Sequence, residues 1–192
     1  MTRKEQKELR KKQIQMKALE LFVRKGYAET KISDIAGELN MSMGLLFHYY
    51  ESKEQLYLEL VQFGVWGTKA NDRIPEEDPL QYFTAYLKGI FEAAAENPWI
   101  FQMFVLMSQA RRAGTPEVVR QKALSVDQIS RSAEIVAKGQ EMGQIREGDP
   151  LTLSNAFWCS VQGIMEEHML TPQIPLPDPE WVVDILRKHA EA

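Results

Sequence analysis

Apolar residues recur at helical spacing through the first half of the chain. Within residues 4–25, Ile14, Ala18, Leu21 and Phe22 share one helical face, and Gly26 follows as a residue typical of a helix end. This spacing predicts an amphipathic helix whose remaining faces are polar and largely basic.

Two short apolar patterns follow. The first repeats at positions i, i+3, i+4 and i+7, at Ile32, Ile35, Ala36 and Leu39. Thr30 is the expected N-cap of this helix, and Asn40 its expected end. Ser42 can cap a third helix that contains Leu46 and Tyr50. Two short helices within 32–50 are therefore predicted, joined by a tight turn.

A fourth helix is expected from residue 53 to 70. Ser52 is its expected cap, and Gln55, three residues later, completes a capping-box pattern. Leu56, Leu60 and Phe63 are predicted to face inward.

Proline marks the remaining helices. Five of the nine prolines follow a residue that can cap a first turn, and proline suits the first helical position, where its missing N–H would have no partner. The pairs are Asp78-Pro79, Asn97-Pro98, Thr115-Pro116, Asp149-Pro150 and Asp178-Pro179. No segment alternates as a strand does, so the predicted class is all-α, with a connector at 171–179.

The helix pair at 32–50 has the layout of a helix-turn-helix, with small Ala36 where two helices would approach closely and a basic helix before it. A generic helical hairpin is the alternative, and the spacing alone leaves it open.

Charge divides the chain at the same place. The whole chain of 192 residues has a formal charge of -4, but residues 1–53 hold 11 Lys+Arg against 7 Asp+Glu, and residues 54–192 hold 12 against 20. The first part is thus +4 and the remainder -8. A solvated basic helix face would explain the excess equally well as a polyanionic partner.

Composition excludes several classes. Cys159 is the single cysteine, which excludes an internal disulfide framework and a multi-cysteine zinc site. No apolar run approaches the roughly 20 residues of a membrane span, and the charged start does not read as a secretory signal, so we expect a cytoplasmic protein without a membrane partner. The three histidines form no metal motif, and no phosphate-binding glycine loop is present, so we expect no enzyme activity, metal or cofactor.

Four segments resemble the signature of the TetR/AcrR transcriptional regulators: Gly26-Tyr27, Thr30–Ala36, Met41–Tyr50 and Ser52–Leu56. The segment Gly143–Pro150 is also similar to a recurrent stretch of that family. The resemblance implies a helix-turn-helix DNA-binding domain at 1–53, a linking helix at 53–70, and a helical ligand-sensing and dimerisation domain at 71–192. It further implies a homodimeric repressor of a palindromic operator in double-stranded DNA, released by a small hydrophobic or amphipathic effector.

The resemblance assigns DNA-contact roles residue by residue. Phosphate contacts are expected from Lys31, Ser33 and Lys53, and base-edge contacts from Met43, Gly44, Leu45 and Phe47. Ser42 would cap the recognition helix, and His48 and Tyr49 would reach phosphates or the groove edge. The first helix would add long-range attraction through Arg3, Lys4, Lys7, Arg10, Lys11 and Lys12.

Three of these positions depart from the family pattern. A polar residue is usual where Met43 stands, threonine at Leu45 and tyrosine at Phe47, so each change removes a hydrogen-bonding group. Apolar side chains can pack on thymine methyl groups, which leads to the hypothesis of an A·T-containing operator. The alternatives are that Met43 or Leu45 belongs to the core and that His48 only packs or bonds to the backbone.

The later helices are expected to form the sensor. Candidate pocket residues are Tyr82, Tyr86, Trp99, Met103, Phe104, Met107, Trp158 and Met165. Aromatic stripes of this kind are also common in cores, so a purely structural role stays open for each of them.

The helices at 150–169 and 178–190 are expected to form the dimer interface, with Cys159 as a packed small residue. The interface candidates are Leu153, Phe157, Val161, Ile164, Trp181, Val182, Ile185 and Leu186. A regulator that binds DNA constitutively, or a helical partner-binding protein without an effector, is the alternative function.

Overall fold

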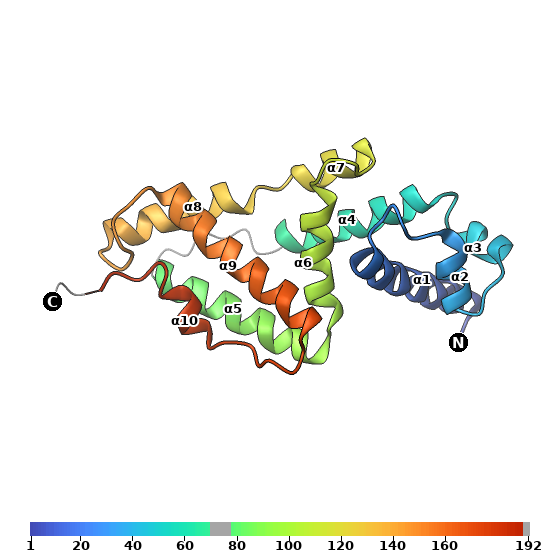
Figure 1. Cartoon of the computed structure of the whole chain (residues 1–192), viewed down its shortest axis with the longest axis horizontal. Helices are drawn as coiled ribbons and strands as arrows, with labels where there is room; N and C mark the ends of the chain where they lie inside the picture. Colours follow the sequence, from blue (N-terminus) through green and yellow to red (C-terminus); the bar gives the residue numbers. More distant parts are fainter. Residues whose placement is uncertain (70–77, 190–192) are drawn as a thin grey trace. The chain divides into compact units, whose positions relative to one another are not determined.

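The computed structural model describes residues 1–69 and 78–189 (Figure 1). Every regular element in these ranges is an α-helix, which confirms the predicted class. One isolated antiparallel bridge joins Ile145 and Arg187. The helices are α1 (Arg3–Lys25), α2 (Ile32–Glu38), α3 (Met43–Tyr49), α4 (Lys53–Lys69), α5 (Pro79–Glu96), α6 (Trp99–Ala110), α7 (Glu117–Leu124), α8 (Gln128–Glu141), α9 (Pro150–Leu170) and α10 (Pro179–Val183). The predicted helix ends at residues 70 and 190 lie outside the described residues.

The helices form two compact units. Unit 1 comprises Met1–Lys69 with Gln102–Val126, and unit 2 comprises Ala70–Phe101 with Asp127–Ala192. In unit 1, α1 packs on α2 and α4, α2 packs on α3, and α4 packs on α7. In unit 2, α8 and α9 pack together, and α5 and α10 pack on each other and on this pair.

Aspartate caps begin three helices as predicted. The carboxylates of Asp78, Asp149 and Asp178 accept hydrogen bonds from first-turn N–H groups, at 2.9, 2.8 and 2.9 Å. In each case proline occupies the first turn, where no donor is lost. Local chemistry therefore fixes where these helices start.

Two predicted caps, Thr115 and Thr30, are wrong, because Pro116 and Lys31 are the N-cap residues of the helices that follow; the side chains of both threonines, and of Asn97, bond backward. The Asn97 amide donates to the carbonyl of Ala93 (3.3 Å), and the Thr115 hydroxyl donates to that of Gln109 (3.3 Å). The hydroxyl of Thr30 donates to the carbonyls of Gly26 and Leu21. Each donor adds a hydrogen bond to a carbonyl near the end of the preceding helix. The residue that caps α2 is Lys31.

One further helix prediction is corrected, and one helix was not predicted. The predicted helix at 178–190 ends at Val183, because the chain then turns and its backbone bonds to residues 144–146. Helix α8 has no proline signal; it starts after Asp127, whose carboxylate accepts from the Ser130 N–H at 3.0 Å.

The core of unit 1 follows the predicted apolar faces. Ile14 and Phe22 of α1 are fully buried, and so are Ile35 of α2, Leu46 of α3 and Leu56 of α4. Phe63 was predicted to face inward and instead is 44% exposed, with its ring stacked on Trp66. At this level of α4 the buried side chains are Val61 and Val65, so the buried stripe has rotated around the helix.

Candidate nucleic-acid interface

A short turn sets the angle between α2 and α3. Asn40 adopts a positive φ of 51°, and the N–H of Met41 donates to the carbonyl of Ala36 at 2.9 Å. Asparagine is among the few side chains that tolerate this left-handed region. Ser42 then caps α3 as predicted, its hydroxyl accepting from the Leu45 N–H at 3.2 Å.

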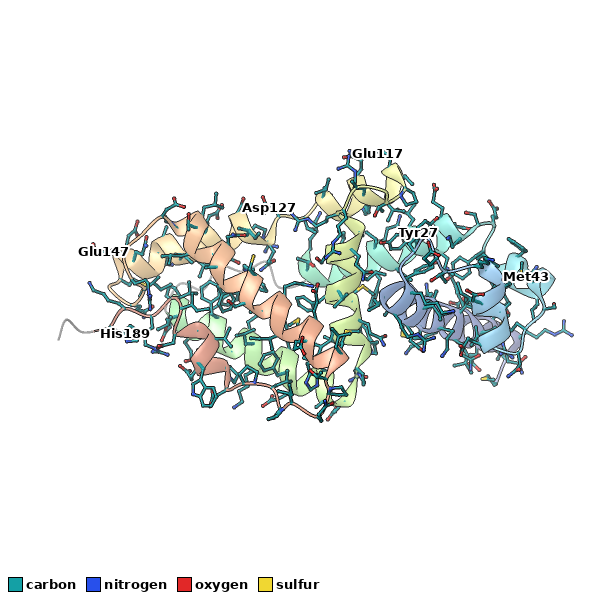
Figure 2. The ribbon with its side chains drawn as sticks, viewed as in Figure 1. Tyr27, Met43, Glu117, Asp127, Glu147 and His189 are labelled. Carbon is teal, nitrogen blue, oxygen red and sulfur yellow. The ribbon has the colours of Figure 1, made fainter. Side chains whose placement is uncertain are left out.

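Helix α3 buries one residue and exposes its other apolar side chains. Leu46 is fully buried, whereas Met43, Leu45 and Phe47 are 42%, 43% and 45% exposed. Figure 2 shows Met43 on α3. A core role for Met43 and Leu45 is therefore excluded within this chain. Solvent exposure of three large apolar side chains on one short helix is typical of a binding surface.

The remaining predicted contacts lie around this face. Lys31 and Ser33 at the start of α2 are exposed, as are Gly44 and His48 on α3. The His48 ring meets Tyr49 edge to face, with centroids 5.8 Å apart, and Tyr49 is half-buried. A Cβ added at Gly44 would meet no atom within 4 Å.

The side chain of Lys53 makes contacts within the chain that the sequence did not predict. Its ammonium Nζ lies 2.6 Å from the carbonyl oxygen of Tyr27, 2.8 Å from that of Thr30 and 3.4 Å from that of Ala28. Burial lowers the pKa of the Lys53 ammonium below its ordinary value. In this arrangement its donors serve carbonyls of the chain itself, and a phosphate contact by Lys53 stays a prediction.

A second polar network supports the end of α3, and the sequence patterns did not predict it. The Glu59 carboxylate on α4 accepts from the Tyr50 hydroxyl and from the Gln15 amide, both at 3.3 Å, and pairs with Lys11 at 2.8 Å. Burial, with Glu59 beside it, raises the pKa of the Tyr50 phenol. Lys11 and Gln15 are four residues apart and so share a helical face, but the sequence does not indicate their common partner, which lies 44 or more residues away.

The first part of α1 is exposed and basic. Ile14 is its first buried residue, and the side chains before it are exposed apart from half-buried Lys11. The exposed cations here are Arg3, Lys4, Lys7, Arg10 and Lys12. We call residues 3–13 the basic arm.

The predicted pocket residues fall in both units. In unit 2, the Tyr86 ring meets the Trp158 ring edge to face, with centroids 5.5 Å apart. The Tyr82 ring is tilted against that of Tyr86, with centroids 6.0 Å apart. Met165 is buried, and Trp99 is half-buried. The Trp158 indole donates to the Ser132 hydroxyl at 2.8 Å, and burial raises the pKa of the Tyr86 phenol.

Three of the predicted pocket residues belong to unit 1. Met103 and Met107 on α6 lie against Gly64 of α4, and Phe104 is half-buried. A ligand-binding role for the predicted set stays a prediction.

Four predicted interface residues are corrected. Phe157 and Val161 on α9, Val182 on α10 and Leu186 are buried within one chain and cannot contact a second copy. Their side chains fill the space between packed helices. Trp181 is 74% exposed, and Leu153, Ile164 and Ile185 are half-buried, so these four remain available. Cys159, predicted to be packed, is exposed.

No cluster of three or more His, Cys, Asp or Glu side chains suited to a metal occurs in residues 1–69 and 78–189. Among the same residues, no helix is both long and apolar enough to cross a membrane.

Comparison with known proteins places this module in a family. Residues 16–60 match the family described as bacterial regulatory proteins, tetR family. The HTH-type transcriptional regulator RutR of Escherichia coli (strain K12) is 25% identical over 160 residues, covering 80% of this chain and 72% of RutR.

Solved structures share the fold. A TetR-family transcriptional regulator from Agrobacterium tumefaciens superposes with a TM-score of 0.74 at 18% identity, covering 95% of this chain and 100% of that one. The structure of AibR in complex with isovaleryl coenzyme A and operator DNA gives a TM-score of 0.67 at 19% identity, covering 91% and 94%. With its capped, exposed α3 set on a buried three-helix core, the segment 16–60 forms the DNA-binding module of the tetR family of bacterial regulatory proteins.

Proposed function

We propose that the chain is a homodimeric repressor that binds a palindromic operator and is released by a small hydrophobic or amphipathic effector. The observation that carries the proposal is the exposed apolar face of α3, formed by Met43, Leu45 and Phe47, on a module of this family. In a helix-turn-helix the second helix enters the major groove, which makes this face the reader of base edges.

The chemistry of the face points to thymine. None of its three large side chains carries a hydrogen-bonding group, so it reads methyl groups and shape rather than donor and acceptor patterns. Exposed Lys31 and Ser33 on α2 supply polar contacts suited to phosphate. We therefore infer an operator with A·T pairs at the positions that α3 contacts.

The basic arm supplies the long-range attraction. Its exposed lysines and arginines contrast with the net negative charge of residues 54–192, so the positive end of each chain faces the duplex. This division disfavours binding through the acidic remainder.

Dimerisation is assigned to the exposed side of α9. Thr152, Ala156, Cys159 and Gly163 are exposed there at helical spacing, and Trp181 is exposed on α10. Small side chains let two copies of α9 approach closely. Two-fold symmetry would then set the recognition helices one DNA turn apart, about 34–36 Å.

The effector site is assigned to unit 2, around Tyr82, Tyr86 and Trp158. Aromatic walls with phenol hydroxyls suit a flat or amphipathic molecule. AibR, which shares the fold, has been solved in complex with isovaleryl coenzyme A and operator DNA, so a protein of this fold can hold a small molecule as well as DNA. Release requires that the effector bind the two states with different affinity.

Fluorescence anisotropy with labelled DNA from the region flanking the chain's own gene tests the proposal. Specific binding that weakens steeply as salt rises from 50 to 200 mM, by about 10³-fold or more for six or more phosphate contacts, supports it. A Lys31→Met variant should reduce the slope of log K against log [salt] by about 0.9. Absence of specific binding at every salt concentration would instead favour a helical partner-binding protein.

A constitutive regulator is the second candidate. It predicts the same DNA binding, unchanged by any compound that quenches the fluorescence of the sensor tryptophan Trp158. Titration of such compounds against the protein–operator complex distinguishes the two.

A further inference from the structure

The side chain of Lys53 links the first turn of α4 to the turn between α1 and α2. Its ammonium faces the carbonyls of Tyr27, Ala28 and Thr30, at Nζ–O distances of 2.6, 3.4 and 2.8 Å. An ammonium has three N–H donors and no acceptor, so three carbonyls match its full donor capacity.

An aromatic stack holds the same lysine from the side. Nζ lies 4.1 Å from the centroid of the Tyr27 ring, and that ring stacks on Tyr57 of α4, with centroids 4.7 Å apart and planes 21° apart. Phe22 of α1 meets both tyrosines, at 5.5 and 5.2 Å. Figure 2 labels Tyr27 at this junction. Lys53 and Tyr57, one turn apart on α4, therefore both contact the Tyr27 ring.

Thr30 carries this linkage to α2. Its hydroxyl donates to the carbonyls of Leu21 and Gly26 at the end of α1, and its own carbonyl accepts from Lys53. The next residue, Lys31, is the N-cap of α2, and its carbonyl accepts the N–H groups of Asp34 and Ile35, at 3.0 and 3.4 Å. The backbone that begins α2 is thus fixed on one side by α1 and on the other by Lys53.

From this geometry we propose that Lys53 is a positioning residue, which sets the start of α2, and with it Lys31, for contact with DNA phosphate. The proposal rests on the DNA-binding function proposed above. It assigns the positive charge at the start of α4 to the protein's own carbonyls. The phosphate contact is left to Lys31, whose side chain is exposed.

The first test uses the protein without DNA, so it does not depend on finding the operator. Lys53→Met keeps the aliphatic stem and loses the ammonium. Amide hydrogen exchange at Asp34 and Ile35 should accelerate at least tenfold in this variant, while amides in the middle of α4 keep their protection. Lys12→Met, in the exposed basic arm, is the matched control and should change neither. Unchanged exchange at the start of α2 would overturn the proposal.

The second test is a double-variant cycle on the operator, using Lys31→Met, Lys53→Met and both together. If Lys53 acts through Lys31, operator affinity falls at least tenfold in each single variant, with little further loss in the pair. The salt slope then falls by about 0.9 in total. If Lys53 clamps a phosphate itself, the losses multiply and the slope falls by about 1.8.

Lys53→Arg decides the matter if Lys53→Met does not fold. A planar guanidinium binds phosphate as well as an ammonium does but does not fit three converging carbonyls. Positioning predicts that Lys53→Arg loses both exchange protection at Asp34 and operator affinity. A phosphate clamp predicts that it retains both.

Discussion

The hydroxyl of Tyr50 donates a hydrogen bond to Oε2 of Glu59, 3.3 Å away, and so joins the residue after α3 to α4. The same carboxylate holds Gln15 and Lys11 of α1. Side chains from α1 and from the end of α3, far apart in the sequence, therefore meet at one carboxylate of α4.

Replacing Glu59 tests how much these contacts contribute to the free energy of unfolding. Glu59→Ala removes a partly exposed ion pair and two hydrogen bonds, and we expect the free energy of unfolding to fall by about 1–2 kcal/mol. Tyr50→Phe removes one of the bonds and should cost about half as much. Gln62→Ala, exposed on the same helix, should stay within about 0.5 kcal/mol of the parent in urea denaturation. Equal values for Glu59→Ala and Gln62→Ala would mean that the junction adds no stability.

Tyrosine burial predicts a loss of stability at alkaline pH. Burial raises the pKa of Tyr57 to about 12, above the value of about 10 expected for the unfolded chain. The folded state thus holds this proton more tightly, and the resulting stability is present below about pH 10 and lost as pH rises through 12. Urea midpoints measured from pH 9 to 12 should fall, and Tyr57→Phe should flatten part of that fall. A parallel decline in both proteins would show that Tyr57 does not contribute.

A substitution at Gly44 distinguishes an effect on folding from an effect on DNA binding. Because a Cβ there would meet nothing in the chain, Gly44→Ala should fold at least as stably as the parent, with a gain of up to about 1 kcal/mol from helix propensity. Operator affinity should nevertheless fall at least tenfold, because the new methyl group occupies the surface that approaches DNA. Thermal unfolding and anisotropy measured on one preparation provide the check. Retention of affinity would place the duplex away from Gly44.

Leu45 is expected to recognise a thymine methyl group. Replacing single operator thymines by deoxyuridine removes only that methyl, and at the contacted position we expect binding to weaken several-fold. The variant Leu45→Ala should lose most of this sensitivity, whereas Lys31→Met should keep it. A parent protein indifferent to every thymine-to-uracil change would contradict apolar readout.

The exposed face of α9 can be probed at Gly163. A Cβ there meets no atom within 4 Å, so Gly163→Trp should leave the single chain folded and shift sedimentation equilibrium toward the monomer. Gly89→Trp, at an equally open glycine of α5, should not. The lone thiol of Cys159 on the same helix should cross-link two chains with a short bismaleimide in the parent only. A dimer unaffected by Gly163→Trp would require another interface.

Local chemistry accounts for what the sequence predicts well. Aspartate-proline pairs fix the starts of α5, α9 and α10, and the Ser42 cap fixes that of α3, because each depends on residues within three positions. The exposure of Leu45 and Phe47 was also foreseeable, since Leu46 between them is the core residue of α3.

Long-range contacts explain what the sequence does not predict. Helix α10 stops early where the Arg146 guanidinium donates to the carbonyls of Asp184 and Arg187, some 40 positions along the chain. Lys53 looks like a surface cation in the sequence, because nothing there shows that three carbonyls from residues 27–30 converge on it. Phe157 and Val161 look equally suited to a core or to an interface until the packing of α9 is known.

The helical length of the basic arm depends on temperature. Residues 3–13 contribute no fully buried side chain to the fold, and a helix this short is marginal on its own in water. Its turns therefore form by extension from the packed residues beyond Ile14, aided at the far end by the Thr2–Glu5 capping box. Helix content that depends on propagation falls on warming, so the arm frays from Thr2 inward as temperature rises. The length over which it presents its cations to DNA is accordingly set by temperature, and is greatest in the cold.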